Sequence, residues 1–455
     1  MRRLFILLAI LLSVAVVKAQ ENGPKPIKLT QEEQQLVQMN NDFAFRLFRQ
    51  ARTDESLLLS PLSITFDLGM LNNGADGITR EEIDAVLGSK DVGGAEVINS
   101  FCRKLLDGCG DLDKETKVSI ANNIYMNKPF ELKKVFGEKA FKYYDAQPES
   151  RDFADGKTRD VINQWCSDHT EGMIKEVLKE NEFNPQAVSY LLNALYFKGM
   201  WTQKFDPSMT QRTYFNEEKA MVEMMQMMDG KFSYTSNDLY QSIILPYGNG
   251  TYQMTVFLPQ YGKTLDDVVA QLNGKSWNTS DYRDYNISYL AFPRFETSTD
   301  LQLEDIMKAL GMPNAFEGGY GFNDFCDGNM FIGMMKQVAK IKLDEEGTEA
   351  SAVTVIEMDK AVGSLPDAKF VADRPFLYTI SERSTGIIFF IGQYMGDETA
   401  EVKGEEVAVK EVKSEEVKSE EVRSKRIYNL SGQRLLTPPA KGLYITDGRL
   451  RYRPQ

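Results

Sequence analysis

Residues 348–358 alternate between two kinds of side chain. The even-numbered positions are small or apolar, whereas the odd-numbered positions mix glutamates with serine and valine. Because successive side chains of a strand point to opposite faces, this alternation predicts a strand with one buried and one exposed face. Residues 359–367 contain Gly363 and Pro366 and predict an exposed loop. A strand-forming segment that runs into an exposed loop can exist either outside a sheet or inside it.

The pattern changes near Asp397, where the globular part of the chain is expected to end. Residues 410–424 repeat Glu, Val, Lys and Ser without an aromatic residue, a composition that cannot form a core. Residues 399–425 are therefore predicted to be a solvated, charged linker. Residues 426–455 return to alternating apolar and polar positions around a Ser-Gly and an Asp-Gly turn, which predicts short strands.

The first residues have the pattern of a secretory signal. Two arginines precede an apolar run over residues 4–17, and a small-residue site ending at Ala19 precedes Gln20. Residues 1–19 are therefore predicted to be a signal peptide. The alternative, a retained anchor, requires a longer apolar run, because about 20 residues are needed to span a bilayer.

The composition is that of a soluble globular protein. The chain has 455 residues, of which 42% are hydrophobic and 26% charged, which is enough for a large core. Its net charge of −13 argues against a nucleic-acid-binding surface, so no nucleic acid is expected as a partner.

Residue types needed for catalysis or metal binding are scarce. His169 is the only histidine, so any Ser-His-Asp or Cys-His arrangement would have to use it. The sequence has no group of His and Cys at the spacing of a zinc site and no Gly-rich phosphate loop. We therefore expect no enzyme, no bound metal and no cofactor.

Four cysteines are too few for a disulfide scaffold. They are Cys102, Cys109, Cys166 and Cys326. On one helix Cys102 and Cys109 would lie about 10 Å apart, beyond the reach of a disulfide. Free, mostly buried thiols are favoured, and a Cys102–Cys109 bridge stays open as the alternative if residues 107–108 break the helix.

Nine short motifs occur in the order in which they occur in serpins, the serine protease inhibitor family. They lie at residues 41–45, 60–64, 119–122, 193–201, 245–247, 293–295, 310–312, 345–352 and 370–377. The resemblance extends over residues 29–397. Such a series in order is specific, whereas one motif alone would be weak.

The resemblance implies an α+β serpin fold with three β-sheets, about eight or nine helices and an exposed reactive loop at about residues 345–370. It implies one serpin domain over residues 20–398, a monomer, and a structural position for His169 at the end of a surface helix. It also implies a suicide-type inhibitor that traps a serine protease, or a cysteine protease, in a covalent complex. The freed loop then inserts into the central sheet. The alternative is a non-inhibitory serpin-fold carrier or interaction protein.

The hinge of the reactive loop is the most specific part of the resemblance. It comprises Glu345, Glu346, Gly347, Thr348, Ala350, Ala352 and Thr354. The resemblance implies Ala361–Val362 as the reactive bond, because the loop spacings usual in serpins give Ala361 when counted from either end of the loop. A small residue there suits an elastase-like or subtilisin-like target. A slip of one residue would place Lys360 there and imply a trypsin-like target.

A second group of residues matches the positions at which the serpin sheet opens. It comprises Ser60, Ser63, Asn193, Gln337, Trp201 and Arg294. Gln337 replaces the histidine usual in the family, and Ser56 replaces a nearby asparagine. Since an amide both donates and accepts hydrogen bonds, the network is expected to survive without pH dependence. An Arg294–Glu345 ion pair is expected to hold the hinge.

Residues 426–455 resemble the C-terminal sorting tails of Gram-negative bacteria that use the type IX secretion route. This resemblance implies that the tail is a partner of the secretion machinery, and that the protein is exported and then secreted or held at the cell surface. The alternative is a small β-domain that binds something local.

Overall fold

A computed structural model describes residues 26–217, 219–278, 281–317, 321–328, 330–348 and 365–396, together with residues 427–428, 434–435, 442–446 and 449–453. The chain divides into two units, Met1–Val402 and Lys403–Gln455, and each is described by itself.

Eight α-helices lie within the described part of the first unit. They are α2 (Gln31–Ala51), α3 (Pro61–Asn72), α4 (Gly77–Leu87), α5 (Gly94–Gly108), α6 (Lys134–Tyr144), α7 (Lys157–His169), α8 (Leu265–Gln271) and α9 (Glu304–Leu310). Three short 3₁₀ helices are η1 (Cys109–Asp111), η2 (Pro207–Met209) and η3 (Pro313–Phe316).

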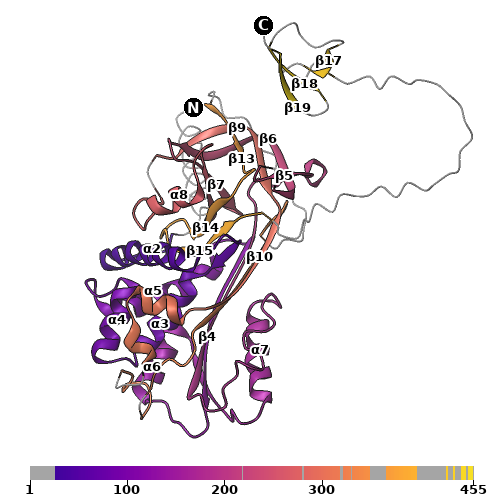
Figure 1. The fold of residues 1–455 in the computed structure, drawn as a ribbon. Helices are drawn as coiled ribbons and strands as arrows, with labels where there is room; N and C mark the ends of the chain where they lie inside the picture. The colour runs from indigo at the N-terminus through magenta and orange to yellow at the C-terminus, as the bar shows by residue number, and fades with distance from the viewer. Residues whose placement is uncertain are drawn as a thin grey trace, which may run out of the picture. The chain divides into compact units, whose positions relative to one another are not determined.

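A six-stranded sheet runs through the middle of this unit in the order β10-β11-β12-β4-β2-β3. Its strands are β10 (Phe295–Gln302), β11 (Lys336–Asp344), β12 (Gly347–Thr348), β4 (Ser189–Met200), β2 (Thr116–Asn127) and β3 (Gln147–Arg151). Helix α7 covers one face, and α3 lies with the other helices on the opposite face (Figure 1).

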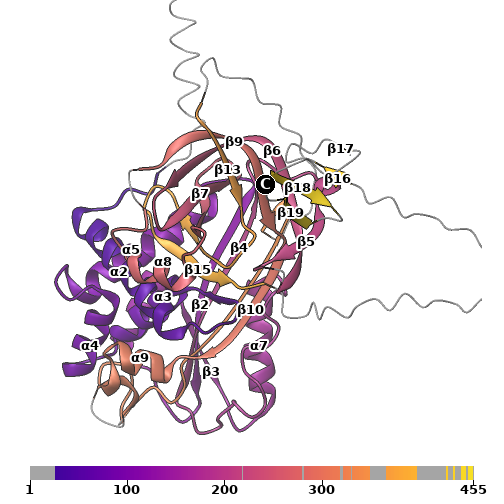
Figure 2. The same cartoon turned by 45° about the horizontal axis from the view of Figure 1, so that its top comes forward.

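A nine-stranded sheet forms the other end of the unit, in the order β1-β15-β14-β8-β7-β6-β9-β13 with β5 beside β6 (Figure 2). Its strands are β1 (Leu57–Leu59), β5 (Gln211–Phe215), β6 (Ala220–Ser236), β7 (Tyr240–Tyr247), β8 (Tyr252–Pro259), β9 (Arg283–Pro293), β13 (Asp367–Val371), β14 (Phe376–Glu382) and β15 (Ile388–Tyr394). Strand β6 has 17 residues and pairs with both β9 and β7. Two of the three predicted sheets are therefore joined here, and the α+β class is confirmed.

Helix α3 begins where the sequence chemistry requires it. Pro61 takes the first helical position, where its missing N–H costs nothing, and Ser60 is the N-cap. The Ser60 hydroxyl accepts a hydrogen bond from the Ser63 backbone N–H at 3.3 Å. This cap fixes two residues of the predicted sheet-opening group at the start of a buried helix.

A small second core lies between α7 and the six-stranded sheet. It consists of Tyr125, Phe153, Ile162, Cys166, Leu178, Tyr190 and Leu192. His169 is the last residue of α7, and its ring stacks on Trp165 with ring centroids 4.2 Å apart. His169 therefore has a structural contact at the helix end.

The second unit contains a four-stranded sheet in the order β17-β16-β18-β19. Its strands are β16 (Ile427–Tyr428), β17 (Arg434–Leu435), β18 (Gly442–Thr446) and β19 (Arg449–Arg453). The short strands predicted for residues 426–455 are present. Across the described residues of the whole chain, none of the helices is long and apolar enough to cross a membrane.

Candidate functional site

The short strand β12 lies between β11 and β4 and pairs with both. Thr348 is opposite Leu343 on one side and Gly199 on the other. Its side chain is 2% exposed, and its hydroxyl is 2.7 Å from the Tyr247 hydroxyl. The first hinge residue predicted to enter a sheet is thus already inside one.

Gly347 has to be glycine for two reasons. Its φ angle of +150° is a conformation that side chains of L-residues rarely adopt. A Cβ there would also collide with the carbonyl oxygen of Gly199 on β4. The close approach of β12 to β4 therefore depends on the absence of a side chain at this position.

Trp201 holds the turn that leads from β11 into β12. Its indole N–H donates to the Asp344 carbonyl at 3.0 Å, and its backbone N–H donates to the Glu346 carbonyl at 2.8 Å. The ring stacks on Tyr247, with centroids 4.5 Å apart and planes 12° apart. Tyr247 therefore supports both this turn and Thr348.

The structure contains the ion pair expected at the hinge. Arg294 Nη1 lies 3.3 Å from Glu345 Oε1, and the Glu345 residue is 6% exposed. The same carboxylate oxygen accepts a hydrogen bond from the Thr210 hydroxyl at 2.6 Å. Because two donors compensate the buried carboxylate, removing either one leaves its charge poorly paired.

Below β12 the sheet is open between β11 and β4. Among the described residues, β12 alone pairs with both strands. A cavity of about 720 Å³ continues from there between residues 336–340 of β11 and residues 189–195 of β4. Residues of α3, of the connection from α7 to β4, and of the segments 302–305 and 330–335 also line it. We call this opening the slot.

Gln337 joins β11 to the start of α3 at one side of the slot. Its amide Nε2 donates to the Ser60 carbonyl at 2.8 Å, and its Oε1 accepts from the Ser60 N–H at 3.0 Å. The Ser60 hydroxyl lies 3.0 Å from the Ser63 hydroxyl and donates to the Phe389 carbonyl at 3.0 Å. Three predicted residues, Ser60, Ser63 and Gln337, therefore form one group.

Asn193 lies on β4 and completes a different pair. Its Nδ2 donates to Asn122 Oδ1 of β2 at 2.9 Å, and its Oδ1 is buried without a hydrogen-bond partner. Within the described part of the chain, no hydrogen bond joins Asn193 to Ser60, Ser63 or Gln337. The four members of the sheet-opening group that line the cavity are thus divided into two halves, Ser60, Ser63 and Gln337 in one and Asn193 in the other. Trp201 and Arg294 lie at the hinge instead.

Asp67 is a residue of the slot that the sequence reasoning missed. It lies on the same face of α3 as Ser60 and Ser63 and lines the cavity. Its Oδ1 has no hydrogen-bond partner, and burial raises the pKa of this carboxyl well above its ordinary value. A single carboxylate in a helix that has no other charged residue was the signal that could have found it.

The other candidate residues lie apart from the slot or outside the described residues. Ser56 accepts a hydrogen bond from the Met395 N–H at 3.0 Å, away from Gln337. Residues 349–364 are not described, so Ala350, Ala352, Thr354, Lys360, Ala361 and Val362 carry no structural account.

The four cysteines are free and buried, as favoured from the sequence. Burial raises the pKa of Cys109 and of Cys166 to about 12. Thiols with so little thiolate at neutral pH are poor nucleophiles. In the described residues there is also no group of three or more His, Cys, Asp or Glu that could hold a metal ion.

These features are those of a serpin. The family model described as "Serpin (serine protease inhibitor)" matches residues 38–396, and the chain belongs to this family. Serpins are generally inhibitors rather than enzymes. Serpin B6 of Macaca fascicularis is 29% identical over 372 residues, which cover 79% of this chain and 98% of the relative.

Solved serpin structures agree with the fold. The native state of tengpin, a thermophilic serpin, has a TM-score of 0.73 at 25% identity, covering 83% of this chain and 97% of tengpin. Human thyroxine-binding globulin complexed with thyroxine has a TM-score of 0.70 at 25% identity, covering 80% of this chain and 98% of the globulin.

We predict that Gln337→Ala destabilises the native protein by about 1–3 kcal/mol, because it leaves buried backbone groups of Ser60 without their partner. Urea denaturation measures this free energy of unfolding. Gln186→Ala, at an exposed glutamine that also lines the cavity, should change it by less than about 0.5 kcal/mol. Equal effects of the two substitutions would contradict the assignment.

Proposed function

We propose that this serpin inhibits serine proteases by inserting its cleaved reactive loop between β11 and β4. The observation that carries the proposal is the slot. The two residues of β12 occupy one end of the slot, and a cavity of about 720 Å³ continues between the same two strands. The alternation of residues 348–358 supplies a strand whose small face suits a core.

The register of β12 predicts where each inserted residue would lie. Thr348 is opposite Leu343 and Gly199, so continuing the antiparallel ladder brings Thr354 opposite Gln337 and Asn193. Opposite residues in a ladder share a face. The Thr354 hydroxyl would then be able to donate to Asn193 Oδ1, which is unpaired in the present structure. Insertion would join the two halves of the sheet-opening group.

The same register separates the even-numbered residues from the odd-numbered ones. Ala352 would lie opposite Ala339 and Leu195, which are 3% and 8% exposed and face the core. Ser351 would lie opposite Lys340, which points to the other face and is partly exposed. On β11 the period of two matches the burial, because the partners of the even-numbered residues are buried and those of the odd-numbered residues are at least partly exposed. On β4 it does not, because Tyr196 and Ala194, which would lie opposite Ser351 and Val353, are 1% and 3% exposed.

Trapping depends on a competition between two steps. The protease serine attacks the Ala361 carbonyl, the bond to Val362 breaks, and the Val362 amine leaves with a proton while an ester joins Ala361 to the enzyme. Fourteen residues from Thr348 to Ala361 reach about 45 Å as a strand. If insertion is faster than hydrolysis of the ester, the protease stays attached. If hydrolysis is faster, it leaves with a cleaved inhibitor.

The target is proposed to be an elastase-like or subtilisin-like serine protease, because Ala361 suits a shallow specificity pocket. A cysteine protease is a second class of partner, since its thiolate forms a thioester at the same carbonyl. The slipped alternative places Lys360 at the reactive bond and selects a trypsin-like enzyme.

A non-inhibitory carrier is the second candidate, and the cavity is the observation in its favour. Human thyroxine-binding globulin has this fold and binds thyroxine. The small side chains of Thr348, Ala350 and Ala352 favour the inhibitor, because a carrier does not need a loop face that can enter a core.

Export is proposed from the two ends of the chain. The pattern of residues 1–19 supports a signal peptide, and that of residues 426–455 supports a sorting tail recognised by a bacterial secretion machinery. The protein would then be secreted or held at the cell surface. N-terminal sequencing of exported protein should begin at Gln20, and a first residue of Met1 would contradict this proposal.

Cleavage of the loop should raise the melting temperature by an amount on the order of 10 °C, because the new strand adds ladder hydrogen bonds and buries its even-numbered side chains. Calorimetry before and after limited proteolysis measures the shift. An unchanged melting temperature is expected of a carrier and would count against the inhibitor.

Ala352→Glu should abolish the denaturant-stable protease adduct while loop cleavage continues, because insertion would bury a charge at a cost of several kcal/mol. The matched control is Ser351→Glu, which would bring a carboxylate beside Lys340 and should keep the adduct. Gel electrophoresis after incubation with the protease separates the two results. Adducts of equal yield would show that the register is wrong.

Ala361→Arg should create inhibition of trypsin-like enzymes and weaken inhibition of elastase-like ones, whereas Lys360→Ala should leave elastase inhibition largely intact. Mass spectrometry of the C-terminal fragment from the wild-type adduct identifies the bond. A fragment that begins at Val362 is expected, one that begins at Ala361 assigns the bond to Lys360, and one several residues away contradicts both assignments.

A further inference from the structure

The connection from α7 to β4 lines the slot along the face of the sheet that α7 covers. We call residues 173–188 the covering segment, and its Leu178 packs with Tyr190 and Leu192 of β4 in the second core. Strand β4 begins at Ser189, directly after this segment. The covering segment is therefore attached covalently to one edge of the slot.

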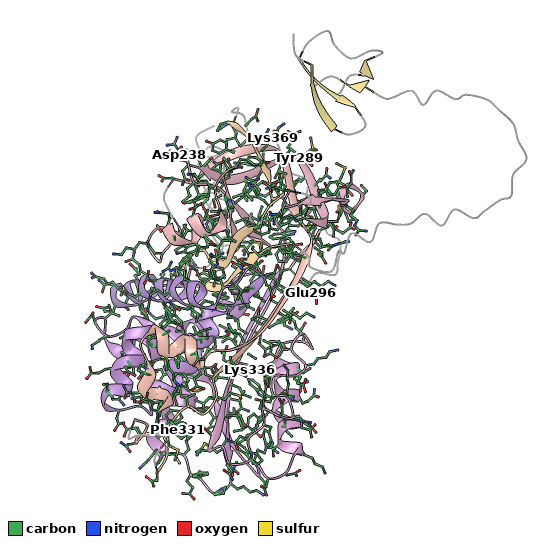
Figure 3. The ribbon with its side chains drawn as sticks, viewed as in Figure 1. Asp238, Tyr289, Glu296, Phe331, Lys336 and Lys369 are labelled. Carbon is green, nitrogen blue, oxygen red and sulfur yellow. The ribbon has the colours of Figure 1, made fainter. Side chains whose placement is uncertain are left out.

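At the other edge, the same segment is bound by charge. Lys336 Nζ of β11 lies 2.7 Å from Glu182 Oε2 and 2.8 Å from Asp300 Oδ1 of β10. Lys179 Nζ lies 2.7 Å from the second oxygen of Asp300. Figure 3 labels Lys336, which is the first residue of β11. We call Lys179, Glu182, Asp300 and Lys336 the charge clamp.

The charge clamp is buried at its centre and open to solvent at its outer pair, where the side chains of Lys179 and Asp300 are 52% and 37% exposed. The Lys336 side chain is 3% exposed and that of Glu182 is 17% exposed. Burial would raise the pKa of Glu182, but hydrogen bonds from Lys336 and from the Lys179 backbone N–H hold this pKa below its ordinary value. Burial likewise opposes the lowered pKa of Asp300, which Lys179 and Lys336 maintain. Both carboxylates are therefore charged at neutral pH.

The register of β12 shows which inserted residues would reach the charge clamp. In the register of β12, Val355 would lie opposite Lys336, and residues 356–358 would lie opposite residues 191–189 of β4. Insertion as far as Thr354 leaves the charge clamp untouched. Completion of the strand requires the covering segment to separate from β10 and β11.

We propose that the charge clamp is a set of ion pairs that has to break before insertion is complete. It thereby delays the last step of insertion and sets the fraction of protease that escapes. Its members are positioning residues, and the inference rests on the proposed function. The covering segment spans the slot from β4 to β11, so opening the charge clamp frees one end of it while the other stays bonded.

Synthetic peptides test the proposal without a protease. A peptide with the sequence of residues 349–358 has to pass the charge clamp, whereas one with the sequence of residues 349–354 does not. Glu182→Gln keeps the side chain's shape and leaves the Lys336–Asp300 pair in place. It should accelerate annealing of the longer peptide about tenfold or more, because a hydrogen bond between charged groups is lost, and leave the shorter one unchanged.

Lys340→Met is the matched control. Lys340 is on the same face of β11 and pairs with Glu296 of β10 at 2.7 Å, without touching the covering segment. It should change neither rate, and Lys336→Met should act as Glu182→Gln does. Hydrogen exchange should rise in residues 178–186 of both Glu182→Gln and Lys336→Met, and not in Lys340→Met. With a target protease, Glu182→Gln should raise the ratio of adduct to cleaved inhibitor, and Lys340→Met should not.

The results separate the two ideas. Equal acceleration of both peptides, or the same effect from Lys340→Met, would show a general loss of stability and overturn the charge clamp. No effect of Glu182→Gln on the longer peptide would overturn it as well. A wild-type protein that anneals neither peptide and forms no adduct with any protease would instead overturn the proposed function.

Discussion

The simultaneous pairing of β12 with β11 and β4 is the constraint on which the rest of the site depends. Two residues hold these strands about two strand spacings apart, roughly 9–10 Å, and set the register of anything that follows them. Gly347 permits the close approach of β12 to β4, and the Thr348 hydroxyl is hydrogen-bonded to the Tyr247 hydroxyl. The Glu345–Arg294 ion pair holds the turn before β12. Without β12, β11 and β4 would have no fixed separation at the end where β12 pairs with both.

The native molecule leaves several favourable contacts unmade around the slot. Asn193 Oδ1 and Asp67 Oδ1 are buried without hydrogen-bond partners, and a cavity stands where a sheet would ordinarily have a strand. Each unmade bond costs free energy in a buried site. On the proposed mechanism, the native structure persists because insertion of the uncleaved loop is slow, which is kinetic rather than thermodynamic stability.

Much of the hinge was predictable from the sequence because its signals are local. The Arg294–Glu345 pair and the entry of Thr348 into a sheet required only neighbouring residues or a family motif. The rest of the period of two lies in residues 349–358, outside the described residues, and stays a prediction. The partners of Gln337 and Asn193 were not predictable, since hydrogen bonds to the Ser60 backbone and to Asn122 follow from packing. The charge clamp draws on three distant segments, in which Lys179, Glu182, Asp300 and Lys336 look like ordinary surface charges. Burial of Lys336 distinguishes them, and burial is set by the tertiary fold.

Cys166 gives the slot a chemical reporter of its own. It lies on α7, lines the same cavity and shares the second core with Leu178 of the covering segment. Burial raises its pKa to about 12, so little thiolate is present at neutral pH. If the covering segment lifts as proposed, an alkylating reagent should react with Cys166 at the rate at which this segment lifts and water enters. Cys102, Cys109 and Cys326 lie in the main core, apart from the second core that holds Cys166. The alkylation rate of Cys166 in the wild-type protein would thus report the opening of the sheet without an engineered label.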